Sequence, residues 1–226
     1  MLAFLFGGFK AMTKNITLLD YGMANLLNVA RAFEHCGASV TIIDNADDVH
    51  LADRLVVPGV GAFEHALQEI RSRHFDQAIQ AFAKTGKPLM GICVGMQMLF
   101  DGSEEFGTHD GLGILPGRVM AIPTTTVDGA AQRVPHIGWS HLVPAEGARA
   151  WEATLLDPFA GQAPAFYFVH SFAAQPDDPK DRLADCMYGG HRICAAVQRD
   201  NVVATQFHPE RSGDAGLALI SAYLKS

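Results

Sequence analysis

A cysteine between two glycines, in the segment Gly91–Gly95, constrains the fold of this sequence more than any other feature. The apolar residues 88–90 before it predict a strand, and the apolar residues at 96, 98, 99 and 100 after it have a helical spacing. G-x-C-x-G between a strand and a helix is the cysteine form of the nucleophile elbow, whose sharp turn needs small neighbours and lifts one side chain above the sheet edge. We therefore predict that Cys93 is a nucleophile at a helix N-terminus, where the helix dipole favours its thiolate. A buried cysteine in a glycine-rich turn is the simpler alternative.

The order of the apolar segments predicts an α/β fold. In the first half, short apolar runs alternate with helical patterns, which is typical of a parallel sheet. The strands are expected at 16–20, 39–44, 54–57 and 88–92, and the helices at 25–35, 63–70 and 75–85. In the second half, a glycine-rich loop at 106–117 precedes short antiparallel strands, expected at 118–122, 139–143, 165–172 and 183–187. A hairpin at 193–198 and 202–207 and a helix at 214–224 complete the order.

No repeat, low-complexity tract or proline-rich linker divides the sequence, so we predict a single domain over residues 15–226. Residues 1–14 are predicted to be an N-terminal extension outside this domain. The first nine residues are apolar, but they lack the basic residues and the small-residue cleavage site of a signal peptide. A short additional packing segment is the alternative interpretation.

The composition excludes several classes of function. The formal net charge of -7 argues against a general nucleic-acid-binding protein, which presents a basic surface. The four cysteines form no CxxC pair and no zinc-site spacing, so we expect reduced thiols and a cytoplasmic location. No apolar run approaches the ~20 residues that a membrane-spanning helix needs. No cluster of histidine, cysteine and acidic residues has metal-ligand spacing, so no metal and no cofactor are expected.

The segment Gln206–Glu210 (QFHPE) contains the partners that a cysteine nucleophile needs, which are a base and a carboxylate that orients it. His208 and Glu210 are two residues apart in a segment expected to be extended, so both side chains should point to the same side. The proline between them restricts the backbone. We predict that Cys93, His208 and Glu210 are catalytic and do not form a mere surface turn. The other nine histidines, including His136, His141 and His170, are given no catalytic role.

A third segment, Pro58–Gly61, follows the strand expected at 54–57 and is rich in glycine. Backbone N–H groups in such a loop, together with the amide that follows the nucleophile, are suited to stabilise an oxyanion. We therefore predict an oxyanion hole formed by Val94, Val60 and Gly61. Glycines on both sides of Val60 make a peptide flip inexpensive, which allows this hole to be switched. An ordinary loop after a strand is the alternative.

Three segments together resemble the class I glutamine amidotransferases: Pro58–Phe63 (PGVGAF), Gly91–Gln97 (GICVGMQ) and Gln206–Glu210 (QFHPE). Three more resemble the glutaminase subunits of imidazole glycerol phosphate synthases: Asp20–Asn25 (DYGMAN), Pro135–Trp139 (PHIGW) and Tyr167–Phe172 (YFVHSF). The resemblance extends from about residue 15 to the C-terminus. It implies a flavodoxin-like fold, with a central mostly parallel sheet, helices on both faces and additional antiparallel strands in the C-terminal half.

The resemblance also implies an activity and a partner. Such subunits hydrolyse L-glutamine to glutamate and ammonia through a cysteinyl thioester, and they pass the ammonia to a cyclase subunit, a (β/α)8 barrel, in a heterodimer. The cyclase then forms imidazole glycerol phosphate and aminoimidazole carboxamide ribotide in histidine biosynthesis. By match to the family's motifs, the residues expected to bind glutamine are Gly59, Gln97, Glu105, Ser171 and Phe172. Those expected to face the partner are Asn25, Val60 and Trp139.

The sequence departs from the family pattern at three positions. Ala24 stands where the family has glycine, Ser140 where it has asparagine and Phe172 where it has tyrosine. The last two remove an amide and a phenol that can form hydrogen bonds, whereas the predicted triad is intact. Because Val60 lies between two glycines, we hypothesise that the isolated chain is a poor glutaminase until the cyclase and its ligand bind.

Three other functions are compatible with parts of this pattern. One is the glutaminase subunit of an anthranilate or aminodeoxychorismate synthase, which the PHIGW and YFVHSF segments disfavour. Another is a free thiol hydrolase of γ-glutamyl bonds, which would need no partner. The third, a non-catalytic interaction subunit, is disfavoured by the intact triad.

Overall fold

Two apolar segments, β3 (Leu55–Gly59) and β4 (Leu89–Cys93), form adjacent parallel strands that are buried along their whole length. Parallel strands that are covered on both faces have continuous apolar sequences, which explains why neither segment alternates. The computed structural model describes residues 14–147 and 149–226, so the predicted N-terminal extension lies outside the described residues except for Lys14.

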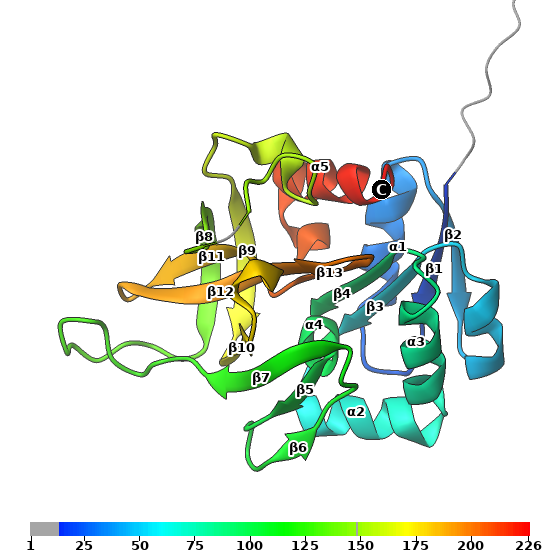
Figure 1. Ribbon diagram of the computed structural model, residues 1–226, viewed down its shortest axis with the longest axis horizontal. Coiled ribbons are helices and arrows are strands. Elements are labelled where there is room, and N and C mark those ends of the chain that lie inside the picture. Colours follow the sequence, from blue (N-terminus) through cyan, green and yellow to red (C-terminus); the bar gives the residue numbers. More distant parts are fainter. Residues whose placement is uncertain (1–13, 148) are drawn as a thin grey trace, which may run out of the picture.

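The parallel half of the main sheet has the strand order β2-β1-β3-β4-β13 (Figure 1). Its other strands are β1 (Asn15–Leu19), β2 (Ser39–Ile43) and β13 (Val202–Thr205). This is the order of flavodoxin-like folds, in which ligands bind at the carboxyl ends of the strands. The predicted fold class is therefore confirmed, and the carboxyl ends of β3, β4 and β13 lie at the same edge.

Helices cover both faces of the parallel half (Figure 1). Helices α1 (Leu26–His35) and α5 (Gly213–Tyr223) contact each other on one face, and α2 (Phe63–Ser72) and α3 (Phe75–Ala83) lie on the other. Helix α1 begins where the Asn25 side chain accepts a hydrogen bond from the Asn28 N–H, and it ends before Gly37, which adopts a φ of 88°. Within the two described ranges, no helix has the length and hydropathy that a membrane crossing requires.

The second half of the chain is mostly antiparallel, as predicted, but it contributes to two sheets, and two of its strands, β7 and β13, also pair in parallel with β5 and β4. Strands β12 (His191–Arg199), β11 (Arg182–Tyr188), β8 (His136–Pro144) and β9 (Ala165–His170) continue the main sheet from β13. A smaller sheet has the order β10-β7-β5-β6, with β10 (Phe172–Pro176), β7 (Leu115–Ala121), β5 (Phe100–Ser103) and β6 (His109–Asp110). Its position beside α2 and below the large sheet is visible in Figure 1.

Two predictions about the second half were wrong. The loop expected at 106–117 contains β6 and the beginning of β7. The single strand expected at 165–172 is two strands, because the chain leaves the main sheet after His170 and enters the smaller sheet at Phe172. Pairing with different partners decides that break, and an apolar run by itself does not reveal it.

The helix after the cysteine is also shorter than predicted. Helix α4 (Val94–Met98) has five residues, and Phe100 already belongs to β5. Met96, Met98, Leu99 and Phe100 are all fully buried, so their apolar character does not mark one face of a longer helix.

Candidate active site

Cys93 occupies a strained turn at the carboxyl end of β4, directly before α4. Its backbone has φ 55° and ψ -112°, a conformation that residues with a side chain rarely adopt. The flanking glycines are sterically required, because a Cβ on Gly95 would lie 1.8 Å from the Val57 oxygen and one on Gly91 would lie 2.9 Å from the Gly95 oxygen. The structure therefore contains the elbow that the sequence predicts. Cys93 is 4% exposed and lines a pocket.

This pocket, about 310 Å³ in volume, brings together residues that are far apart in the sequence. They come from the loop after β3, from the elbow and α4, from the segment after β5, from the junction of β9 with β10, and from the segment after β13. The predicted residues that line it are Val60, Gly61, Cys93, Val94, Gln97, Glu105, Ser171, Phe172 and His208. Their convergence at one edge follows from the parallel order of β3, β4 and β13.

His208 and Glu210 form a buried pair behind the cysteine. The Nδ1 of His208 lies 2.9 Å from Oε1 of Glu210, and their side chains are 5% and 4% exposed. The segment is not extended as predicted, because Pro209–Arg211 forms a turn of 3₁₀ helix. The turn, and not the alternation of an extended chain, brings the carboxylate back to the imidazole. Glu210 is thus placed to hold Nδ1–H and to leave Nε2 free for a proton.

The electrostatics of the pocket favour a charged imidazole. Burial by itself lowers the pKa of His208, but the adjacent Cys93 and Glu210 outweigh it and raise that pKa to about 10. Among the described residues, His208 Nε2 has no hydrogen-bond partner, although it is buried. An imidazolium beside a thiolate is the state in which a cysteine is most nucleophilic at neutral pH.

Gln97 is a buried residue of the site and not a polar surface position. Its Nε2 donates to the Phe172 carbonyl and to Oε1 of Gln206, each at 3.0 Å. Gln206 in turn places its Nε2 3.7 Å from the Cys93 sulfur. Nothing in the sequence pattern distinguished Gln206 from the rest of QFHPE, and its contact with the thiol is a finding of the structure.

Of two further residues predicted to bind glutamine, Glu105 and Gly59, only Glu105 lines the pocket. Its Oε2 accepts a hydrogen bond of 2.6 Å from the N–H of Phe63 at the start of α2. Gly59 does not line this pocket but lies beneath the elbow. A Cβ on Gly59 would lie 2.6 Å from the Tyr21 hydroxyl and 2.8 Å from the Gly95 nitrogen. The structure therefore places Gly59 in support of the turn.

The predicted oxyanion donors are not equally available. Val94 is the first residue of α4, so its N–H is among those that a helix leaves without an intrahelical partner. The N–H of Val60 instead donates to the Met23 carbonyl at 2.9 Å. In this conformation, Val60 must break that hydrogen bond before its amide can stabilise an oxyanion in the pocket.

His170, a histidine for which the sequence predicted no catalytic role, lines the pocket. Its Nε2 lies 3.1 Å from Nδ1 of His136, and its Nδ1 lies 2.9 Å from the Phe172 carbonyl. Pro135 and Val169 also line the wall without having been predicted. A histidine in an otherwise apolar strand was the available signal, but its neighbours across the sheet come from a segment 34 residues away.

The residues predicted to face a partner are all exposed, and one of them, Val60, also lines the pocket. Asn25 is exposed at the start of α1, and Val60 is exposed on the loop after β3. On β8, Ile137 and Trp139 are 59% and 56% exposed on the face that points away from the buried His136. These neighbouring apolar side chains are suited to a protein contact.

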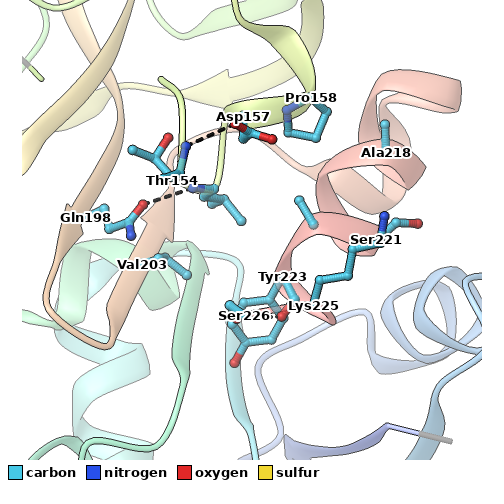
Figure 2. A pocket seen from close by; sticks show the side chains of 13 residues that line it. Thr154, Asp157, Pro158, Gln198, Val203, Ala218, Ser221, Tyr223, Lys225 and Ser226 are labelled. Atoms are coloured by element: carbon cyan, nitrogen blue, oxygen red, sulfur yellow. Dashed lines mark hydrogen bonds between the residues drawn. The ribbon is translucent and has the colours of Figure 1, made fainter. Parts of the chain in front are cut away.

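A larger cleft of about 590 Å³ lies elsewhere (Figure 2). It is bordered by the segment around Thr154 and Asp157 and by the end of α5 near Tyr223, on the side where β3 and β4 begin. Its carboxylate and amide groups are occupied within the wall, since Asp157 accepts from the Ala153 N–H at 3.0 Å and Gln198 from the Leu155 N–H at 2.9 Å. We therefore place the chemistry at the smaller pocket, where the cysteine lies.

Comparisons with known proteins agree with this geometry. The sequence model of the family "Glutamine amidotransferase class-I" matches residues 17–222. A subunit HisH 1 of imidazole glycerol phosphate synthase from Legionella pneumophila (strain Lens) is 45% identical over 93% of this chain and 99% of its own. The corresponding subunit HisH from Rhodopirellula baltica is 44% identical over 92% and 96%. A solved glutamine amidotransferase, 17% identical, superimposes with a TM-score of 0.67 over 92% of this chain and 98% of its own.

Proposed function

Because this chain belongs to the class I glutamine amidotransferases, and within them to the family of the imidazole glycerol phosphate synthase subunit HisH, we propose that it is the glutaminase subunit of that synthase. It hydrolyses L-glutamine to glutamate and ammonia, and the ammonia is used by a cyclase subunit. The observation that carries this proposal is the pocket in which Cys93 lies beside the buried His208–Glu210 pair.

The reaction begins with the Cys93 thiolate, which forms a bond to the side-chain amide carbon of glutamine. The carbonyl oxygen becomes an oxyanion, which the N–H of Val94 stabilises. When the carbon–nitrogen bond breaks, His208 donates the proton that the departing ammonia takes up. A thioester remains. His208 then removes a proton from water, the hydroxide adds to the thioester, and glutamate leaves as the thiolate is restored.

Two groups of residues support this chemistry. Glu210 keeps Nδ1 of His208 protonated, so that Nε2 is the atom that exchanges protons. Gln97, Glu105 and the backbone of Ser171–Phe172 hold the α-amino and α-carboxylate groups of glutamine. Glu105 supplies the negative charge for the ammonium group, and Gly59 permits the elbow to approach β3 closely.

The partner is a cyclase with a (β/α)8 barrel, and the two chains form a heterodimer. Asn25, Val60 and Trp139 face it, together with the exposed Ile137. The Val60 N–H donates a hydrogen bond to the Met23 carbonyl, so docking of the cyclase on these exposed residues can release that N–H and complete the oxyanion hole. The cyclase then converts ammonia and an aminated ribulose phosphate into imidazole glycerol phosphate and aminoimidazole carboxamide ribotide.

Replacement of the nucleophile tests this function. With the cyclase present, Cys93→Ala should abolish synthesis from glutamine but leave synthesis from an added ammonium salt unchanged, because only the ammonia source is lost. Cys36→Ala is a matched control, since the Cys36 thiol donates a hydrogen bond to the Leu217 oxygen in α5, at 3.4 Å, and does not line the pocket. It should keep both activities. Glutamine-dependent synthesis by Cys93→Ala at the native rate would exclude the proposed chemistry.

A further inference from the structure

A buried pair of histidines joins β8 to β9 beside the candidate active site. His136 and His170 face each other across the two strands and are 2% and 6% exposed. The ring of His136 is stacked between Phe168, at 5.0 Å, and Tyr188, at 4.1 Å between ring centroids. Packing on both faces fixes the plane of this ring. The triad mechanism uses neither histidine.

The hydrogen bonds of this pair determine where its protons lie. A backbone carbonyl can only accept, so Nδ1 of His170 carries a hydrogen toward the Phe172 oxygen at 2.9 Å. In a neutral ring, Nε2 of His170 must then accept, and Nδ1 of His136 donates to it at 3.1 Å. Nε2 of His136 is left to accept from the Ser140 hydroxyl at 2.9 Å. All four ring nitrogens are satisfied by one arrangement, in which both rings are neutral.

Burial supports the neutral state. Desolvation lowers the pKa of His136 and of His170 to about 4, so neither ring is charged at neutral pH. A protonated His170 would also turn Nε2 into a donor and reverse its bond with His136. The three hydrogen bonds therefore run in one direction, from Ser140 on β8 to the Phe172 carbonyl at the start of β10.

The Phe172 carbonyl connects this series to the site. It accepts a second hydrogen bond from Nε2 of Gln97, at 3.0 Å. The other hydrogen on the same nitrogen goes to Oε1 of Gln206, also at 3.0 Å, and Gln206 contacts the Cys93 sulfur. The orientation of both amides thus depends on the position of one carbonyl, and His170 is the only donor to it besides Gln97 among the described residues.

We propose that His136 and His170 are positioning residues: a neutral imidazole pair that holds the Phe172 carbonyl, and through it the Gln97 and Gln206 amides, in the geometry that glutamine binding beside Cys93 requires. This inference rests on the proposed glutaminase function. The pair acts through Phe172 and Gln97 and takes no part in proton transfer, so its loss affects the binding of glutamine more than the chemical step.

Kinetics of two variants test the proposal in the complex with the cyclase. His170→Leu removes the donor to Phe172, and the loss of one buried hydrogen bond should raise KM for glutamine about tenfold while kcat changes less than about threefold. His170→Asn can place an amide N–H where Nδ1 lies, and it should return KM to within about threefold of the native value. His35→Leu, at an exposed position in the last turn of α1, is the matched control and should leave KM unchanged.

Each outcome has a definite meaning. All three variants should co-elute with the cyclase in size-exclusion chromatography as the native chain does, which shows that they fold and assemble. An unchanged KM in His170→Leu, or equal damage in His170→Leu and His170→Asn, would overturn the proposal while the glutaminase function stands. If the native complex itself released no glutamate from glutamine, the proposed function would fail instead.

A spectroscopic measurement on the native protein does not depend on any variant. In ¹⁵N-labelled protein at neutral pH, the ring nitrogens of His136 and His170 should both show the Nδ1–H tautomer. Detection of the Nε2–H tautomer or of a charged ring at either position would contradict the hydrogen-bond series. This result holds even if His170→Leu does not fold.

Discussion

Neutralising the carboxylate behind the catalytic imidazole should slow the glutaminase strongly without unfolding it. Glu210→Gln preserves the size of the side chain and its ability to accept from Nδ1 of His208, which lies 2.9 Å away. It removes the negative charge that favours the imidazolium. Because both side chains are buried, solvent screens this interaction little.

The magnitude follows from the distance. Two unit charges at 2.9 Å attract by roughly 6 kcal/mol at an effective dielectric constant of about 20. The charge is shared by two oxygens, and the amide still accepts a hydrogen bond, so we expect about half of that, roughly 3 kcal/mol, to be lost. This corresponds to a fall in kcat of about 10²-fold.

Two assays measure this effect. The first is glutamate release in the presence of the cyclase and its ligand. The second is alkylation of Cys93 by iodoacetamide at neutral pH, which needs no partner and should slow because the neutral amide no longer stabilises the imidazolium beside the sulfur. Glu146→Gln makes the same change at an exposed position, 3.7 Å from Arg192, and should be silent in both assays. A folded Glu210→Gln protein with a native kcat would refute the charge argument.

Three further predictions concern stability. Gly95→Ala should prevent folding or lower the thermal midpoint by more than about 10 °C, because its Cβ would lie 1.8 Å from the Val57 oxygen. Gly37→Ala has open space around its Cβ, so its free energy of unfolding should fall by only about 1–2 kcal/mol, the cost of a left-handed backbone; equal midpoints of the two variants would contradict the steric argument. The free energy of unfolding should decline as the pH falls from 6.5 toward 4, because the folded state resists protonation of His170 that the unfolded chain accepts. In urea unfolding, the decline should be smaller by about 3 kcal/mol in His170→Asn than in the native protein, and parallel pH profiles of the two proteins would argue against this cause. Tyr223→Phe should lower the free energy of unfolding by about 1–2 kcal/mol, since its buried hydroxyl lies 3.1 Å from the Leu55 oxygen and 3.0 Å from the Pro88 oxygen, and a loss below experimental error would show that neither bond contributes.

The accuracy of the sequence predictions depends on the range of the interactions involved. The elbow around Cys93 was predictable because G-x-C-x-G is a local pattern. Its two glycines are required by different neighbours, since a Cβ on Gly91 would meet Gly95 of the same strand–helix unit and a Cβ on Gly95 would meet Val57 of β3. The pairing of His208 with Glu210 was predicted correctly, but for the wrong local reason, since a 3₁₀ turn and not an extended segment brings them together. The break at Ser171 was missed because it depends on which strands pair with each side of it.

By itself, the sequence determined the α/β order, the strained cysteine turn and the segments that carry the triad, because apolar spacing and the G-x-C-x-G motif are patterns of residues that are close along the chain. Only the tertiary structure decided that Gln97 is buried against Gln206, that Gly59 supports the elbow, and that the Val60 N–H donates a hydrogen bond to the Met23 carbonyl. It also decided that His170 lines the site and that His136 contacts it from the neighbouring strand. These contacts form between segments that are distant in sequence, and their geometry is fixed by strand pairing and close packing, which no local pattern encodes.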